Sequence, residues 1–163
     1  MSERIATDAT SPAHLLVVGS VAFDNVITPY GQKEHILGGA ASYCSFASSY
    51  FAETRMVGVV GNDFGEEFID RLRSRGIDLE GLQRDESGPT FFWKGKYHEN
   101  FNRRDTLDLQ LNVFEKFRPD LPESYRASPF VLLGNIHPAL QAHVLDQLSG
   151  ESFVLADTID LWI

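Results

Sequence analysis

One carboxylate in this sequence lies where a ligand would be expected to bind. Asp24 belongs to the stretch Gly19–Asn25, which directly follows a short apolar run at Leu15–Val18. If that run is a strand of an open α/β sheet, the residues after it lie at the carboxyl edge, where such sheets bind ligands. A carboxylate there can accept hydrogen bonds from two adjacent sugar hydroxyl groups. Asp24 alone is also suited to capping a loop, but its position after the strand favours a hydroxyl ligand.

Two consecutive glycines, Gly38 and Gly39, precede an apolar stretch that is typical of a helix. Because they lack Cβ atoms, another group can approach the backbone closely, and the helix start offers free N–H donors and the positive end of its dipole. Such a corner can hold sugar hydroxyls or an anion. A tight turn that needs a positive φ explains the same pair of glycines.

Three aromatic residues share one face of a predicted strand. Phe91, Trp93 and Tyr97 alternate with other residues at the period of a strand. Their rings can stack on a substrate or enclose it, which would exclude water from a reaction. These three aromatic residues fit equally well as the hydrophobic face of a lid, meaning a small sheet that covers a binding site, or as a contact with a second subunit.

Weaker candidates are polar residues elsewhere in the chain. Asn135 and His137 follow the apolar run Phe130–Leu133, so both are expected at a carboxyl edge. His137 precedes Pro138, and a helix-entry position is the preferred interpretation for it. Asn102 is the remaining candidate for a residue that binds the ligand.

These residues need a framework of buried strands and intervening helices. Four β-rich apolar runs lack polar alternation, as strands covered on both faces do; they are Leu15–Val18, Met56–Val60, Phe130–Leu133 and Phe153–Ala156. Helical patterns fall between them at 39–51, 63–75 and 138–148. Strands that alternate with helices predict a doubly wound, mostly parallel α/β sheet.

Each predicted helix has its own signature. Residues 39–51 are apolar nearly all round, so we expect that helix to be deeply buried. The second helix has capping-box spacing from Asp63 to Glu66 and a stop at Gly76. In the third helix we expect four side chains to face inward, namely Leu140, Val144, Leu145 and Leu148.

Other segments alternate like strands with one apolar face. Residues 91–98 and 107–113 show this alternation, and 25–37 adds two short extended stretches around a turn. Together they predict a small antiparallel sheet attached to the α/β body. We divide the chain into a polar tail at 1–12 and one domain at 13–163, with segments of this lid at about 25–37 and 89–113.

The composition excludes several classes of function. The formal net charge of −9 over 163 residues repels nucleic acid and anionic membranes. The single cysteine, Cys44, cannot form an intramolecular disulfide and fits a reducing compartment. No apolar run approaches the length of a membrane span, and the polar start does not resemble a signal peptide. We therefore expect a cytoplasmic protein.

Four motifs together resemble the ribokinase-like (PfkB-type) carbohydrate kinases. They are V-V-G-S at 17–20 with Asp24, G-G-A-A at 38–41, G-V-V-G-N-D-F-G at 58–65 and R-S-R-G-I-D at 73–78. The resemblance implies an α/β domain with a β lid, and ATP with Mg²⁺ as co-substrate in the intact enzyme. It also implies that Asp24 grips sugar or nucleoside hydroxyls above Gly38 and Gly39, that the aromatic residues cover the substrate, and that the lid can form a homodimer.

The sequence departs from this family in two ways. Tyr43 stands where the family often has an asparagine that reaches the sugar, so the acceptor need not be ribose. The resemblance also implies a carboxyl-terminal half with an N-x-x-E motif and a G-x-G-D motif that holds the catalytic base. We expect that base beyond Ile163, assign no catalytic or metal-binding residue here, and predict that this chain alone is inactive.

Two other functions were weighed against a sugar kinase cut short. The first is a non-catalytic sugar-binding or interaction module that has lost the kinase half. The second is a dinucleotide-binding oxidoreductase, which lacks support because no G-x-G-x-x-G follows the first strand. The sequence stops at Trp162-Ile163, shortly after a buried-type strand, and this ending favours truncation.

Overall fold

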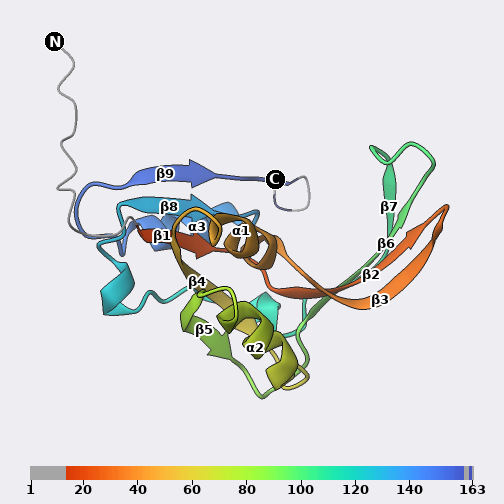
Figure 1. Ribbon diagram of the computed structural model, residues 1–163, viewed down its shortest axis with the longest axis horizontal. Coiled ribbons are helices and arrows are strands. Elements are labelled where there is room, and N and C mark those ends of the chain that lie inside the picture. Colours follow the sequence, from red (N-terminus) through yellow and green to blue (C-terminus); the bar gives the residue numbers. More distant parts are fainter. Residues whose placement is uncertain (1–13, 160–161, 163) are drawn as a thin grey trace, which may run out of the picture.

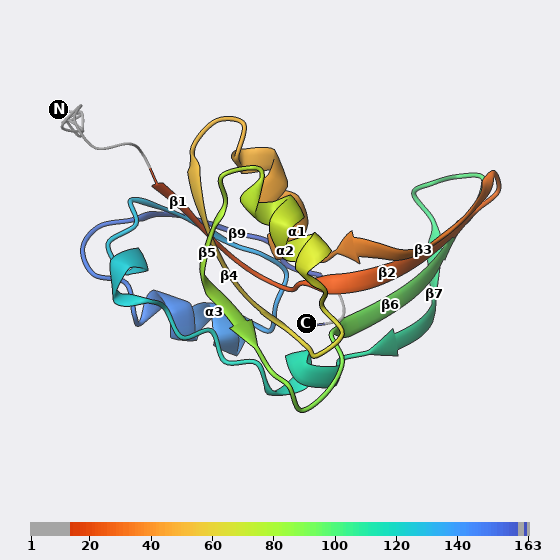
Figure 2. The same ribbon diagram turned by 60° about the horizontal axis from the view of Figure 1, so that its bottom comes forward.

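The computed structural model describes residues 14–159 and 162, arranged as two β-sheets with helices on the larger one. The predicted polar tail at 1–12 lies outside the described residues. Figures 1 and 2 show the smaller sheet projecting from the body as a curved lid. In the part that is described, no helix is both long and apolar enough to span a bilayer.

The body is a sheet of five parallel strands in the order β5-β4-β1-β8-β9. Their bounds are β1 His14–Val18, β4 Glu53–Val60, β5 Asp78–Arg84, β8 Phe130–Leu133 and β9 Phe153–Ala156. All four predicted strands are therefore present, but the expectation that Phe153–Ala156 is covered on both faces is wrong, because all four residues of this edge strand are exposed. The edge strand β5 was not predicted, because most of its residues are polar. Its close packing depends on Gly81, because a Cβ there would meet Val57 and Tyr125.

Helices cover both faces of this sheet, which confirms the doubly wound architecture (Figures 1 and 2). They are α1 Ala40–Ser48, α2 Glu66–Arg73 and α3 Pro138–Leu145, with short 3₁₀ turns at Asn112–Lys116 and Glu123–Tyr125. Val17 packs with residues of α1 and α2, whereas its neighbours Leu16 and Val18 pack with Val144 of α3. Adjacent strand residues point to opposite faces, so a central strand such as β1 contributes to two cores.

The expectation that residues 39–51 form a deeply buried helix is wrong. The buried residues of α1 are small (Ala41, Ser42 and Ser45), while Tyr43, Tyr50 and Phe51 are 58%, 70% and 91% exposed. Small side chains let the helix lie close to the sheet. A Cβ at Gly134 would come within 2.8 Å of the Ala40 Cβ.

The predicted capping box before α2 is also wrong. Gly65 is the N-cap and makes no side-chain capping bond. The Asp63 carboxylate instead accepts hydrogen bonds from Thr90 N (2.8 Å) and Thr90 Oγ1 (2.6 Å). Gly76 does end this helical segment with a positive φ of 70°. In α3, Val144 is buried as predicted, but Leu145 is exposed.

The lid is a four-stranded mixed sheet in the order β3-β2-β6-β7. It consists of two antiparallel hairpins, β2 Ala22–Thr28 with β3 Gly31–Gly38 and β6 Phe91–Tyr97 with β7 Arg104–Gln110. The central pair, β2 and β6, is parallel, so the lid is not wholly antiparallel as predicted. β2 and β6 run outward from the body, and β3 and β7 return toward it (Figure 2).

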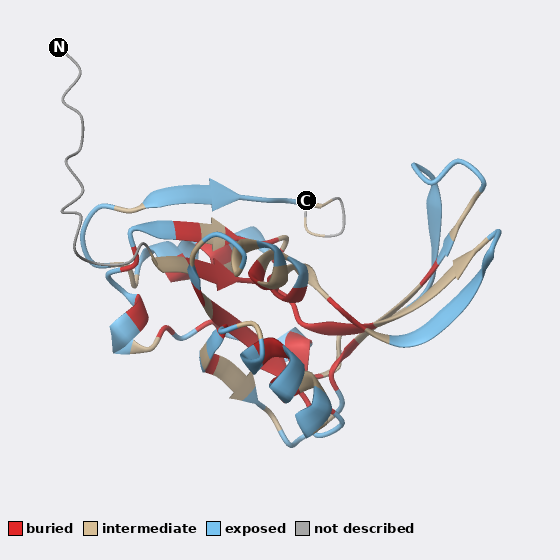
Figure 3. Cartoon of the chain, in the orientation of Figure 1, coloured by how far each residue is buried: buried red, intermediate tan, exposed pale blue. Residues whose placement is uncertain are grey.

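The last lid strand starts and ends earlier than the predicted 107–113. Leu107 lies at a register shift between β6 and β7, which breaks the alternation expected from the sequence. Val113 and Phe114 then turn into the core of the body on a 3₁₀ helix. Figure 3 shows the resulting contrast between the buried body and the exposed outer part of the lid.

Thr90 anchors the lid to the body. Its Oγ1 accepts a hydrogen bond from the buried Gly61 N (2.9 Å) and donates one to Asp63, and its carbonyl accepts one from Asn112 Nδ2 (2.9 Å). This buried hydroxyl therefore joins the G-V-V-G-N-D-F-G segment to the start of β6.

Replacing the Thr90 hydroxyl is expected to destabilise the protein. Thr90→Val leaves Gly61 N buried without an acceptor, and this should lower the free energy of unfolding by about 1–3 kcal/mol. Urea denaturation measures the loss. Thr28→Val, in an exposed turn, is the control and should change stability by less than about 1 kcal/mol. Equal stability of the two variants would contradict the anchoring role.

Candidate functional site

A cavity of about 820 Å³ lies between the lid and the carboxyl edge of the parallel sheet. Its lid wall comes from β2, β6 and β7, and its body wall from α1 and the segments after β1, β8 and β9. The lining residues are Ser20, Ala22, Asp24, Gly39, Ala40, Tyr43, Cys44, Phe91, Trp93, Tyr97, Arg104, Thr106, Leu109, Asn135, Asp157, Ile159 and Trp162. The volume is within the range of about 300–1,000 Å³ that is usual for small-molecule sites.

Strand register places the lid residues on one face. Ala22 pairs with Phe91, and Asp24 pairs with Trp93 across the parallel strands β2 and β6. Side chains of paired residues point to the same side of a sheet. The Asp24 carboxylate and the Trp93 indole are therefore neighbours on the wall of the cavity.

Asp24 presents a half-buried carboxylate to the cavity. Burial alone raises the pKa of this carboxyl from 3.8 to about 6, since no described residue donates a hydrogen bond that would hold it ionised. Such a group has its acceptor capacity free for a ligand. Two adjacent hydroxyl groups would supply the donors that the protein does not.

Gly38 makes room for this carboxylate and does not line the cavity. It pairs with Ala22 on β2, and a Cβ at position 38 would collide with the carboxylate of Asp24. The structure thus gives Gly38 a role beside Asp24, whereas the sequence analysis placed it under the ligand.

A methyl group at Gly38 should therefore weaken acceptor binding. Gly38→Ala is expected to displace the Asp24 side chain and lower the affinity for the acceptor about 10-fold or more, which is the loss of about one charge-assisted hydrogen bond. Calorimetric titration with the acceptor measures this loss of affinity. Gly88→Ala is a matched control, because its Cβ would meet nothing nearer than Val113 Cγ1 at 3.6 Å. Unchanged affinity in Gly38→Ala would contradict this role.

Gly39 lines the cavity, but the helix start behind it is already occupied. Ser20 accepts hydrogen bonds from Ala41 N through its carbonyl (2.9 Å) and from Ala40 N through Oγ (3.1 Å). The expectation of free donors is wrong for these two N–H groups. Gly39 has a φ of 90°, which agrees with the simpler interpretation of a turn that needs glycine.

The body wall places a second polar group opposite the lid. Asn135 and Asp157 follow β8 and β9, and Asn135 Nδ2 lies 3.4 Å from Asp157 Oδ2. Tyr43 also lines the cavity, and burial together with the nearby charge of Asp24 raises the pKa of its phenol. The cavity therefore has two acidic groups set among aromatic and amide side chains.

Two residues that the sequence suggested as ligand-binding candidates lie outside the lining of the cavity. Asn102 is in the exposed loop between β6 and β7, where its N–H donates to Asn100 Oδ1 (3.0 Å). His137 is the N-cap of α3, and its Nδ1 accepts a hydrogen bond from Ala139 N (3.2 Å). The preferred helix-entry interpretation of His137 is therefore confirmed.

Several lining residues escaped the sequence analysis. Arg104, Thr106 and Leu109 belong to β7, and the register shift at Leu107 hides their common face from a simple alternation. Ser20 offered a usable signal, because it follows the same strand as Asp24. Ile159 and Trp162 reach the cavity only through the path of the chain after β9.

No group of three or more His, Cys, Asp or Glu side chains is close enough to hold a metal ion within the described ranges. The spacing N-x-x-E occurs at Asn112–Glu115, but Asn112 is bonded to Thr90 and Glu115 points to solvent. The arrangement can hold a hydroxyl-bearing acceptor.

Comparisons with known proteins agree with this geometry. Residues 12–92 match the model of the pfkB family carbohydrate kinases. A cytidine kinase from Thermococcus kodakarensis is 29% identical over 141 residues, which cover 84% of this chain and 49% of that protein. A 2-dehydro-3-deoxygluconokinase from Thermoproteus tenax is 32% identical over 74 residues, covering 40% of this chain and 22% of that protein.

Solved structures show the same fold. Ribokinase from Cryptococcus neoformans var. grubii serotype A, in complex with ADP, superposes with a TM-score of 0.74 at 17% identity, over 93% of this chain and 51% of that one. A nucleoside kinase from Burkholderia thailandensis, in complex with inosine, gives a TM-score of 0.67 at 16% identity, over 82% and 48%. The chain spans about half the length of these structures, and half or less of the two relatives' length.

Proposed function

Because the chain belongs to the pfkB family of carbohydrate kinases, we propose that it is the acceptor-binding half of an ATP-dependent sugar or nucleoside kinase. The reaction would transfer the γ-phosphoryl group of ATP to a hydroxyl of the acceptor. The observation that carries this proposal is the free, half-buried Asp24 carboxylate on the wall of a ligand-sized cavity.

Each wall of the cavity has a part in positioning the acceptor. Asp24 would hold two adjacent hydroxyls and so fix the orientation of a third toward the phosphoryl donor. Phe91, Trp93 and Tyr97 on the lid would cover the acceptor and keep water from competing for the phosphoryl group. Asn135, supported by Asp157, would bind the acceptor from the body side.

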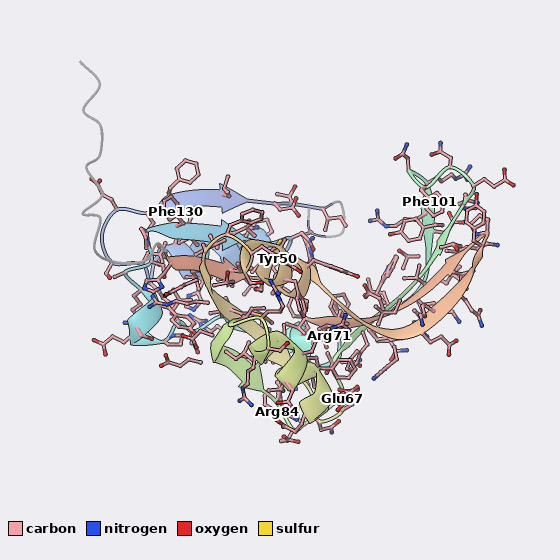
Figure 4. The ribbon with its side chains drawn as sticks, viewed as in Figure 1. Tyr50, Glu67, Arg71, Arg84, Phe101 and Phe130 are labelled. Atoms are coloured by element: carbon pink, nitrogen blue, oxygen red, sulfur yellow. The ribbon has the colours of Figure 1, made fainter. Side chains whose placement is uncertain are left out.

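The donor side of the reaction would come from outside this chain. ATP, Mg²⁺ and the catalytic base would be held by a second half that carries the G-x-G-D motif of the family. Such an enzyme would act in the cytoplasm on a small molecule, not on nucleic acid. The rings of Tyr30 and Phe101 stack with their centroids 6.2 Å apart. Phe101 lies on the outer part of the lid, remote from Phe130 on the body (Figure 4), and this aromatic pair would suit a homodimer contact.

The test compares this chain with a protein of family length that contains it. The short chain should bind a sugar or nucleoside in calorimetric titrations, and the long protein should phosphorylate the same compound with ATP and Mg²⁺. Binding without phosphorylation by the long protein would favour the non-catalytic sugar-binding module. Failure of both proteins to bind any sugar or nucleoside would overturn the proposed function.

A further inference from the structure

Each hairpin of the lid has one extra residue on its edge strand, and the two irregularities lie at the same level. In the β2–β3 hairpin, Asn25 opposes two residues of β3, 34 and 35. In the β6–β7 hairpin, the register shifts after Lys94, where Leu107 is the extra residue. Asn25 and Lys94 are direct partners across the central strands. Because a bulge bends its strand, the lid has one transverse crease, and Figure 1 shows it curved.

This crease divides the lid residues that line the cavity into two groups. Asp24 and Trp93 lie on the body side of the crease, whereas Tyr97, Arg104 and Thr106 lie beyond it. In a straight strand, Tyr97 would lie about 13 Å beyond Trp93 and away from the body. The bend therefore turns the outer half of the lid back over the cavity.

The bulge on β3 is fixed by a side chain of the neighbouring strand. Asn25 Oδ1 accepts a hydrogen bond from His35 N (2.8 Å), and His35 has a positive φ of 53°. Such a φ is uncommon outside glycine, and a bulge is one of the places where it occurs. The His35 ring stacks on Phe23 with the centroids 3.9 Å apart and meets the ring of Phe68 on α2 edge-on at 5.6 Å. The crease is thereby tied to a helix of the body.

Trp93 spans the crease on the side of the cavity. Its Nε1 donates to Thr106 Oγ1 (3.1 Å), which lies beyond the crease. A Cβ at Gly95 would collide with the indole, so the ring lies across the first residue of the outer half of β6. Trp93 also lines the cavity, whereas Asn25 and His35 lie outside its lining. A change at Asn25 can therefore release the bend without removing a contact with the acceptor.

We propose that Asn25 and His35 are positioning residues, which hold the outer half of the lid at the angle where Tyr97, Arg104 and Thr106 reach the acceptor. This inference rests on the proposed function and adds to it two residues that act without touching the acceptor. Their effect on binding passes through the outer half of the lid.

Distances between spin labels test this angle directly. The labels are attached through Asn102→Cys at the tip of the lid and Asp70→Cys on the exposed face of α2, in a Cys44→Ser protein. Pulsed electron paramagnetic resonance measures the distribution of distances between them. Asn25→Ala removes the acceptor at the bulge and should broaden this distribution, whereas Asn25→Asp keeps an oxygen acceptor and should retain the parent distribution. Gln32→Ala, at an exposed position of the same hairpin, is the matched control and should change nothing.

Calorimetric titration of the 163-residue chain with ribose and cytidine measures the consequence for binding. Asn25→Ala should weaken the binding of either compound roughly 2- to 10-fold, which corresponds to about one hydrogen bond to the acceptor. The same substitution should have a smaller effect in a Tyr97→Leu protein, because two changes that act through one contact are not additive. A general structural defect would weaken binding equally in both proteins.

The contrary outcomes are distinct. An unchanged distance distribution in Asn25→Ala, or a broadened one with unchanged affinity, overturns the inference while the proposed kinase function stands. If the parent chain binds neither compound nor any other sugar or nucleoside, the proposed acceptor site fails. The distance distribution alone then decides whether Asn25 and His35 hold the lid.

Discussion

Asp24→Ala is expected to lower kcat/KM of the family-length enzyme by about 100-fold or more. The variant removes two charge-assisted hydrogen bonds to the acceptor, each of which contributes about 1.5–3 kcal/mol. The loss should appear with the same acceptor in steady-state kinetics and as weaker binding to the 163-residue chain. Near-normal kcat/KM in a folded Asp24→Ala protein would refute the assignment of Asp24 as the hydroxyl ligand.

The raised pKa of Asp24 predicts opposite effects on binding and on stability. The folded protein holds this proton up to about pH 6, whereas the unfolded chain releases it near the ordinary pKa of 3.8. Between these values the folded state binds more protons, so the free energy of unfolding falls as pH rises. Acceptor affinity should change the other way and decline as pH drops below about 6, because the hydroxyls need an ionised carboxylate.

Asp24→Asn separates these two effects. It should be more stable than the parent protein above pH 6, by on the order of 1 kcal/mol for a carboxylate that is still partly exposed, and equally stable below pH 4. Thermal unfolding at pH 4 and pH 7.5 measures the difference. Asp70→Asn, on the exposed face of α2, is the matched control, and a gain of the same size and sign in that variant would contradict the assignment of the effect to Asp24.

The second large expected effect is a complete loss of kinase activity in the short chain. The 163-residue chain alone is expected to show no phosphoryl transfer from ATP, because donor, metal and base must be held together around the γ-phosphate. Among its acidic side chains, Asp63 accepts hydrogen bonds from Thr90, and Asp24 and Asp157 line the cavity that we assign to the acceptor.

ATP turnover with Mg²⁺ and a panel of sugars and nucleosides measures this activity. The family-length protein is the positive control, and the inert short chain should still bind the acceptor. Acceptor-dependent turnover by the short chain at a rate comparable to that of the long protein would disprove the assignment of this chain to an acceptor half.

Local patterns in the sequence were sufficient for most of the body. The neighbouring parallel strands β1 and β8 contain continuous apolar runs, the pattern that is typical of strands covered on both faces. β9 has the same kind of run, although its four residues are exposed. The edge strand β5 has no such run. The orientation of α1 was also hidden, because Ala41, Ser42 and Ser45 are buried by their small size and not by their hydrophobicity.

The site was predictable where it depends on strand ends and alternation. Asp24, Asn135 and Trp93 are all recognised by their place in or after a strand. Contacts between distant segments were not predictable, and the bonds from Ser20 to the start of α1 and from Asp63 to Thr90 are examples. In each of these pairs, the sequence around one residue contains no pattern that identifies the other residue.

The parallel pairing of β2 with β6 has a consequence for how the chain folds. The two hairpins of the lid are separated in sequence by α1, β4, α2 and β5, so their union is a non-local contact that requires a large loop to close. Each hairpin alone is a two-stranded ribbon and at best marginally stable in water. We therefore expect the lid to assemble late in folding, after the body has formed, and Asp24 and Trp93 to become neighbours only in that step.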